Sequence, residues 1–251
     1  LRGTAVGWPH FLVEHREQHR GVAIGGGERD LQHPHRGGAI ALAREIERAA
    51  VVDAQHRRDI AAGKLDADNF SVNGKWVPWY NLHKTFAGLH DAYVYAGNQQ
   101  AKQMLLQLSD WALKLTSQLS DQQLQQMLIT EYGGMNDVLA NIYSFTGNKK
   151  YLDLSYKFYD EFVMGKLAQR IDPLPGKHSN TNVPKAIGSA RQYELTGNKN
   201  DQNIASFFWE TMVHYHSYVI GGNSNYEYCG EAGKLNDRLS DNTCETCNTY
   251  N

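Results

Sequence analysis

The sequence has few cysteines, no excess of either charge and no long apolar run. Three cysteines in 251 residues cannot all pair with one another, which argues against a disulfide framework. The formal net charge of −2 gives no electrostatic reason to expect binding to nucleic acid. No apolar run approaches the roughly 18 residues that a membrane helix needs. The residues that follow Leu1 also lack the charged and apolar regions of an export signal. We therefore expect a protein that binds neither nucleic acid nor membrane.

Residues 1–62 lack four residue types that are common in the rest of the chain. They contain no lysine, serine, asparagine or tyrosine, yet they hold nine of the twelve arginines and six of the eleven histidines. One explanation is a basic, partly helical extension, with its best helix at Ala39–Val52. The other is a stretch translated in the wrong frame or joined artificially, and the sharpness of the change favours it. We expect the folded domain to span residues 63–251.

Strand-type alternation of apolar and polar residues is nearly absent after residue 62, and an internal repeat dominates instead. A helical pattern ends each time in a Gly-Asn pair, and these pairs recur with a spacing of 50 residues. The three pairs are Gly97-Asn98, Gly147-Asn148 and Gly197-Asn198. Glycine just past the last periodic residue is typical of a helix C-cap, because it adopts the left-handed conformation without strain.

A second helical pattern follows each Gly-Asn pair, at residues 101–118, 150–162 and 201–215. Its apolar residues recur at i, i+3 and i+4, as in a helix that buries one face. The repeating unit is therefore predicted to be an αα-hairpin, present three times. Stacked hairpins of this kind indicate an all-α fold, either an open solenoid or a closed toroid.

The links between the hairpins are the first candidates for a functional surface. They span residues 120–134, 165–184 and 219–243, and they are polar and rich in glycine, asparagine and histidine. All three join the end of one hairpin to the start of the next, so they lie at the same end of the stack. Functional groups are often carried by such loops. A shared active face is favoured over ordinary solvent-exposed connections.

An aromatic cluster precedes the first hairpin. Trp76, Trp79 and Tyr80 lie in residues 69–81, which we expect to be a loop or short extended segment because Pro78 disfavours a helix interior. Two interpretations stay open: a hydrophobic plug against the next helix, or a wall on which a sugar stacks. The plug is favoured for each aromatic residue taken singly.

All three cysteines lie in the last thirty-one residues of the sequence. Cys244 and Cys247 flank Glu245, and Glu227 lies upstream in a loop rich in glycine and asparagine. Thiolate and carboxylate groups are ligands that zinc accepts, and a thiolate is also a nucleophile. Free thiols in a loop are an equally simple interpretation. A thiol redox role is weaker, because the βαβ context that usually carries it is absent.

Several long strings of the sequence resemble one family of bacterial enzymes. The strings are WVPWYNLHKTFAGLHDAY, EYGGMNDVLANIY, PGKHSNTNVPKAIGSARQYELTGN, SYVIGGNSNYE and ETCNTYN. In this order they are similar to the β-L-arabinofuranosidases of glycoside hydrolase families 127 and 146. The resemblance covers about residues 63–251 and leaves out residues 1–62.

The resemblance implies an (α/α)6 toroid and a retaining hydrolase whose nucleophile is a zinc-bound cysteine. It implies that Glu245 and Cys247 are zinc ligands and that Glu227 is the general acid/base. A partly buried glutamate can hold its proton near neutral pH, as this role requires. The nucleophilic cysteine would belong to a Cys-Cys motif that the sequence does not contain. Cys244 and Cys229 depart from the family pattern. We therefore expect a partial toroid that is inactive alone, with weak zinc binding or none.

Polar residues on the same loop face are candidates for binding the furanose hydroxyls. They are His83, Glu131, Asn136, His178 and Asn180. A structural hydrogen-bonding role is an equally open alternative for each of them. The expected partner is an arabinofuranose-containing glycan in the periplasm or outside the cell, as the resemblance implies, and the oligomeric state is open. The alternative function is a non-catalytic αα-repeat module that binds glycans or proteins.

Overall fold

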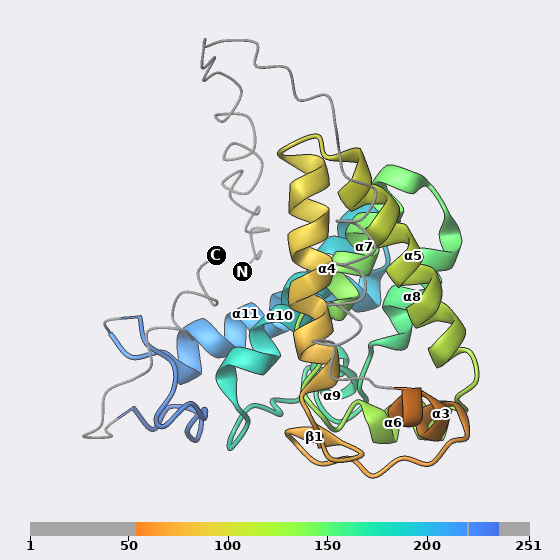
Figure 1. The fold of residues 1–251 in the computed structure, drawn as a ribbon. Helices are drawn as coiled ribbons and strands as arrows, with labels where there is room; N and C mark the ends of the chain where they lie inside the picture. Colours follow the sequence, from red (N-terminus) through yellow and green to blue (C-terminus); the bar gives the residue numbers. More distant parts are fainter. Residues whose placement is uncertain (1–53, 220, 236–251) are drawn as a thin grey trace, which may run out of the picture. The chain divides into compact units, whose positions relative to one another are not determined.

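A computed structural model describes residues 54–219 and 221–235 of the chain (Figure 1). These residues are predominantly helical and contain one short antiparallel β-hairpin, which confirms the predicted all-α class. The elements, in chain order, are α3 (Ala54–Ala61), β1 (Ser71–Val72), β2 (Lys75–Trp76), α4 (Pro78–Val94), α5 (Gln99–Thr116), α6 (Asp121–Met127), α7 (Met135–Thr146), α8 (Lys149–Lys157), α9 (Met164–Ala168), α10 (Ser179–Thr196), α11 (Lys199–Thr211) and the π-helix η1 (Met212–His216).

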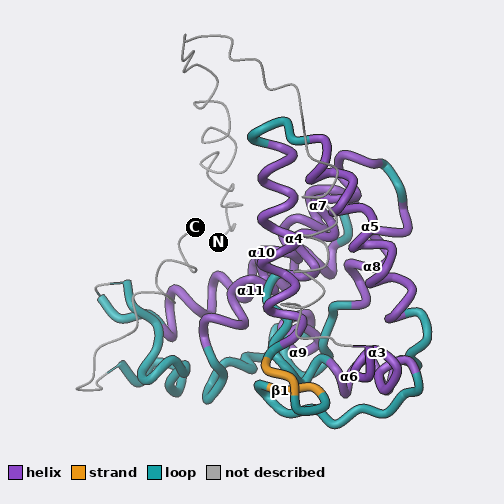
Figure 2. The backbone as a smooth tube through the Cα atoms, viewed as in Figure 1, coloured by secondary structure: helices purple, strands orange, loops and turns teal. Residues whose placement is uncertain are grey.

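Three αα-hairpins are present where the repeat predicts them: α4–α5, α7–α8 and α10–α11 (Figure 2). The glycine of each Gly-Asn pair has a positive φ, between 65° and 72°. The asparagine that follows caps the second helix, because its side chain accepts a hydrogen bond from a backbone N–H of the first turn. The hairpins contact each other in chain order, α4 with α7 and α7 with α10. Closure into an (α/α)6 toroid stays a prediction.

Several helix boundaries differ from those expected, and two of the differences have a clear physical reason. The first helix begins at Pro78 rather than after Asn81, because proline is well tolerated in the first helical turn, where its missing N–H costs no hydrogen bond. Helix α8 ends at Lys157 rather than at Phe162. The chain turns there because Phe158 is buried against Trp79, with ring centroids 5.0 Å apart, and Asp160 then accepts hydrogen bonds from the start of the next segment.

The expected domain boundary after residue 62 has to be moved. Helix α3 contacts α5, and its Ile60 is 1% exposed within the main hydrophobic cluster. His56 of the same helix is also buried. An apolar side chain in the core stabilises the domain, so residues 54–62 belong to it. Residues 1–53, including the helix expected at Ala39–Val52, lie outside the described residues.

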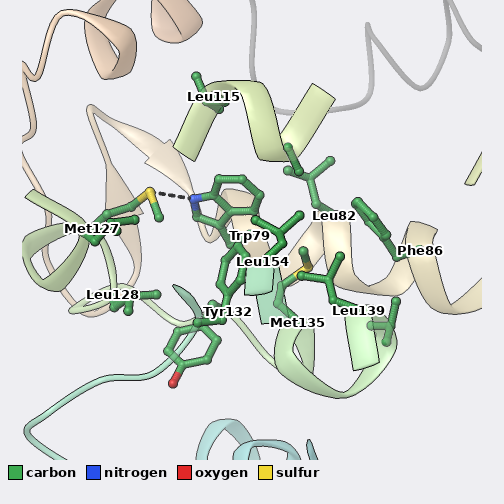
Figure 3. Packing of buried hydrophobic residues seen from close by; sticks show 14 of the residues in the cluster. Trp79, Leu82, Phe86, Leu115, Met127, Leu128, Tyr132, Met135, Leu139 and Leu154 are labelled. Carbon is green, nitrogen blue, oxygen red and sulfur yellow. Dashed lines mark hydrogen bonds between the residues drawn. The ribbon is translucent and has the colours of Figure 1, made fainter. Parts of the chain in front are cut away.

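The main core surrounds Trp79 (Figure 3). Its indole ring is 2% exposed, and the ring N–H donates to the sulfur of Met127 at 3.0 Å. Residues from α4 to α8 pack around it, including Phe86, Leu139 and Leu154. Trp79 is therefore a hydrophobic plug against the following helices, as the favoured interpretation predicted, and it does not form a wall for a sugar.

A second apolar cluster joins α9, α10 and α11. Its buried members are Val163, Met164, Leu167, Leu174, Val183, Ala186, Ile204, Phe208, Met212 and Cys229. Both clusters include residues of the links between hairpins, such as Leu128 in the first and Leu174 in the second. Within residues 54–219 and 221–235, no helix combines the length and apolarity that crossing a membrane requires.

Candidate active site

Three polar side chains, one from each link between hairpins, lie close together. Glu131 follows α6, His178 immediately precedes α10, and Glu227 follows η1. The Glu131 Oε1 and His178 Nδ1 atoms are 2.5 Å apart. The His178 Nε2 and Glu227 Oε2 atoms are 3.9 Å apart. The imidazole ring therefore has a carboxylate at each of its two nitrogens.

The Glu131–His178 pair is largely shielded from water. The side chains of Glu131 and His178 are 11% and 14% exposed. An ionised carboxylate only accepts hydrogen bonds, so the contact places a proton on Nδ1 of His178. In neutral His178, the Nε2 atom then presents a lone pair towards Glu227. The pair thus fixes both the orientation and the tautomer of the ring.

Glu227 lies at the tip of a strained turn. Tyr226 and Glu227 have φ values of 49° and 73°, in the left-handed region that non-glycine residues rarely adopt. The residues on either side, Asn225 and Tyr228, exchange two backbone hydrogen bonds of 2.9 and 3.1 Å. Two central residues with positive φ are typical of a type I′ turn, which asparagine and glycine normally occupy. Strain of this kind persists where the surrounding structure imposes it, and functional sites are a common place for it.

Backbone hydrogen bonds hold this turn against the start of α10. The Ser179 N–H donates to the carbonyl of Glu227 at 2.8 Å, and the Cys229 N–H donates to the carbonyl of Lys177 at 2.9 Å. The Ser179 hydroxyl also donates to the buried side chain of Asn223 at 2.8 Å. The first N–H groups of a helix lack partners within the helix. The carbonyl of Glu227 satisfies one of them, which couples the turn to His178.

The Glu227 side chain itself is 56% exposed. The partial burial that we expected for a general acid is therefore not supplied by the described residues. Any exclusion of water from this carboxylate has to come from a bound ligand or from the rest of the chain. The carboxylate is accessible to a ligand that also reaches His178.

Aromatic rings surround His178 on two sides. The centroid of the Tyr228 ring lies 5.7 Å from that of His178, and the centroid of the Phe70 ring lies 6.4 Å away with the two ring planes at 63°. Trp76 stacks on Phe70 and is 63% exposed. Neither Phe70 nor Tyr228 is among the site residues expected from the sequence. Tyr228 could have been found from its position next to Glu227, whereas Phe70 reaches the site through the β-hairpin.

His83 packs against the glycine pair that follows Glu131. A Cβ atom added to Gly133 would lie 2.6 Å from Nδ1 of His83, and one added to Gly134 would lie 2.9 Å from Nε2. Burial, with a smaller contribution from the charge of Lys84, lowers the pKa of His83 from 6.5 to about 4. His83 is therefore neutral at pH 7 and sits beside the segment that carries Glu131.

The two asparagines expected to bind substrate differ in position. Asn136 of α7 is fully buried, donates to the carbonyl of Lys185 at 2.9 Å, and fills the space beside Gly188 of α10. Its side chain is used in the contact between two helices, so we assign it a structural role in place of the substrate contact. Asn180 is the second residue of α10, two positions after His178, and is half-buried.

A buried ion pair lies behind the site. The Lys185 Nζ and Asp160 Oδ2 atoms are 2.8 Å apart, and both side chains are nearly inaccessible. The Tyr132 hydroxyl donates to the same carboxylate oxygen at 2.5 Å, and Lys185 lies over the Tyr132 ring. Burial, followed by the charge of Asp160, raises the pKa of Tyr132 well above its usual value. This cluster ties α10 to the residue next to Glu131.

The expected zinc ligands, Glu245 and Cys247, lie outside the described residues, as does Cys244. Cys229 is 3% exposed in the second apolar cluster, where it behaves as a small apolar residue. Across the described ranges, no three histidine, cysteine, aspartate or glutamate side chains are arranged to hold a metal ion.

A comparison with known families identifies the family of this chain. Residues 43–251 match the family described as beta-L-arabinofuranosidase, GH127 catalytic domain. The match begins before α3, in agreement with the buried position of Ile60. A comparison with curated proteins found no match. The chain belongs to the GH127 β-L-arabinofuranosidase catalytic-domain family.

Proposed function

We propose that Glu131, His178 and Glu227 form the binding site for a β-L-arabinofuranoside, with Glu227 as the general acid/base. The observation that carries this proposal is the position of an exposed carboxylate on a strained turn beside a shielded carboxylate–imidazole pair. The three groups come from three separate links, so the fold brings them together at one place. Family membership supports a sugar furanoside as the ligand.

The roles follow from the chemistry of glycoside cleavage. A proton has to reach the leaving oxygen as the glycosidic bond breaks, and a carboxylic acid beside that oxygen can supply it. Glu227 is the accessible carboxylate of the site. Glu131 and His178 contact each other, are largely shielded from water and present hydrogen-bonding atoms, so they suit the recognition of sugar hydroxyls. A sugar seated over Glu227 would also remove water from its carboxylate.

Zinc is the cofactor that the resemblance implies. Its ligands would be Glu245 and Cys247, whose donor atoms are of the types that zinc accepts, although a complete site needs about four donors. Bound zinc would keep a sulfur ligand deprotonated. The assignment is tested by zinc content after dialysis of a version of the chain that also carries the Cys-Cys motif, because this chain alone is expected to bind zinc weakly or not at all. Cys247→Ser and Glu245→Gln should lose metal, and Glu227→Gln should retain it; the opposite pattern would mean that ligand and acid have been exchanged.

We further propose that this polypeptide binds arabinofuranosides without hydrolysing them. The nucleophile that the resemblance implies belongs to a pair of adjacent cysteines, and no two cysteines are adjacent in this sequence. The alternative is a non-catalytic αα-repeat module that binds glycans or proteins, and the exposed position of Glu227 is compatible with it. In the glycoside hydrolase, Glu227 would transfer a proton once a nucleophilic cysteine is present. In the non-catalytic module it would not.

The test measures binding and turnover separately. Methyl β-L-arabinofuranoside should bind the full chain in a calorimetric titration, and His178→Gln should weaken this binding about tenfold or more. Glu231→Gln, an exposed glutamate in the same loop, is the matched control and should bind as the parent does. Absence of binding to the parent chain would refute the proposed function. Release of nitrophenol from an aryl arabinofuranoside, abolished by Glu227→Gln, would refute the proposed inactivity and support the assignment of the acid.

A further inference from the structure

A pair of stacked aromatic rings extends from the site to the surface. Trp76 and Phe70 are nearly parallel, with an interplanar angle of 17° and centroids 5.2 Å apart. Phe70 in turn contacts His178, with ring centroids 6.4 Å apart and the ring planes at 63°. Trp76 is 63% exposed, whereas Trp79, three residues later, is 2% exposed. One tryptophan of the segment thus enters the core, and the other stays at the surface beside the site.

The backbone that keeps Trp76 at the surface is strained. Val77, which caps α4, has a φ of 30°, although β-branched residues are strongly disfavoured at positive φ. Its N–H donates to the carbonyl of Phe70 at 2.7 Å, and the Asn81 side chain donates to the carbonyl of Trp76 at 3.1 Å. A left-handed residue between the two tryptophans directs them to different environments. An exposed aromatic side chain held by a strained backbone indicates a role in binding, because burial would otherwise be favoured.

The aromatic pair is fixed to the segment that carries Glu131. The Asp68 carboxylate accepts hydrogen bonds of 2.7 Å from the N–H groups of Phe70 and Ser71. The Thr130 hydroxyl lies 2.5 Å from the carbonyl oxygen of Asp68 and 2.6 Å from that of Ser71. The Glu131 N–H donates to the carbonyl of Asn69 at 3.1 Å. These contacts fix the backbone around Phe70, on which Trp76 stacks, relative to Glu131.

We propose that the exposed face of Trp76 binds a second sugar ring, the one linked to the arabinofuranose that occupies the site at His178. This inference rests on the proposed function and extends it. The face of an indole ring is electron-rich and attracts the slightly positive C–H groups on the face of a sugar. A single aromatic ring suits one sugar, because a protein partner would need a far larger interface. The ligand class is therefore a di- or oligosaccharide rather than an isolated arabinofuranoside.

Calorimetric titration of the full chain with two probes tests the subsite. The probes are methyl β-L-arabinofuranoside, which has one ring, and a disaccharide with a β-L-arabinofuranosyl group at its non-reducing end. The disaccharide should bind the parent more tightly than the methyl glycoside does. Trp76→Ala should weaken the binding of the disaccharide about tenfold and leave that of the methyl glycoside within about twofold. Trp76→Phe, which keeps an aromatic face, should recover part of the loss.

Tyr95→Ala is the matched control. Tyr95 is 80% exposed and follows the opposite end of α4, so its removal should change neither affinity. Equal loss for both probes, or no loss for either, overturns the subsite while the proposed function stands. If Trp76 is covered by another part of this chain, the disaccharide gains nothing over the methyl glycoside, and this outcome also overturns the subsite. Binding of neither probe to the parent refutes both. Circular dichroism of each variant separates loss of binding from loss of folding.

Discussion

Gly134 leaves no room for a side chain beside His83. A Cβ atom at this position would lie 2.9 Å from Nε2 of His83 and 3.5 Å from Cβ of Pro184. The φ of Gly134 is −92°, which any residue can adopt, so the constraint at this position is steric. The His83 ring and the backbone that follows Glu131 therefore fix each other's positions.

This contact predicts opposite effects for two glycine substitutions. Gly134→Ala should lower the free energy of unfolding by about 1–3 kcal/mol, because the added methyl group has to displace His83 or the backbone. Gly88→Ala, in the middle of α4, meets no atom within 4 Å and should raise it by about 0.5–1 kcal/mol. Urea denaturation of both variants measures the difference. Equal stability of the two would contradict the tight contact.

The free energy of unfolding should decrease as the pH is lowered, because the buried His83 ring disfavours protonation. Its pKa is about 4 in the folded protein and 6.5 when unperturbed. Above pH 6.5 neither state binds the proton, so the full stability is present. Between pH 6.5 and pH 4 only the unfolded chain binds it, and the free energy of unfolding decreases by at most about 3 kcal/mol.

The pH dependence can be assigned by substitution. His83→Gln should flatten the curve of unfolding free energy against pH between 6.5 and 4, relative to the parent. His214→Gln removes an exposed histidine and should leave the curve unchanged. The comparison between the two variants removes the contribution of the other histidines. An unchanged slope in His83→Gln would show that this ring is not held neutral by burial.

Removal of one partner of the buried Asp160–Lys185 ion pair should lower the free energy of unfolding strongly. Asp160→Asn keeps the oxygen that accepts from the Val163 N–H but leaves the Lys185 charge buried without its partner. We expect a loss of about 3–5 kcal/mol in the free energy of unfolding. Adding Lys185→Met to this variant should recover part of the loss, since no unpaired charge remains. A double variant less stable than Asp160→Asn would mean that Lys185 stabilises the fold by other contacts.

Helix α3 provides the test of the revised domain boundary. Ile60→Ala should lower the free energy of unfolding by about 3 kcal/mol, because the side chain is buried in the main cluster. Ile187→Ala, at a 42% exposed position of α10, should change it by about 0.5 kcal/mol or less. Thermal or urea denaturation compares the two. If both variants unfold alike, residues 54–62 contribute nothing to the core and the boundary belongs after residue 62.

The αα-hairpins could be predicted from the sequence because local chemistry determines where their helices meet. Gly147 and Gly197 end helices in the left-handed conformation, and the asparagine after each of them caps the next helix. Only neighbouring residues are involved, so the repeat is visible in the sequence. The C-terminal end of α8 depended instead on the contact of Phe158 with Trp79, which are far apart along the chain.

Part of the site could also be predicted, because local chemistry determines where the hairpins end. The links that carry Glu131, His178 and Glu227 follow from the hairpin repeat, but the pairing of Glu131 with His178 spans 47 residues. The left-handed conformation of Val77, which keeps Trp76 at the surface, contradicts the preference of valine. Asn136 resembled its polar neighbours in sequence, and only the packing of α7 on α10 revealed that it is buried.

Glu227 itself should stabilise the fold less than glycine would. Its φ of 73° is costly for any side chain, and glycine adopts it freely. Glu227→Gly should therefore raise the free energy of unfolding by about 1 kcal/mol, whereas Glu227→Gln keeps the strain and should leave it unchanged within about 0.5 kcal/mol. The carbonyl that accepts from the Ser179 N–H remains in both variants. If the glycine variant is the less stable of the two, the turn is not strained, and the argument that strain marks Glu227 as functional fails.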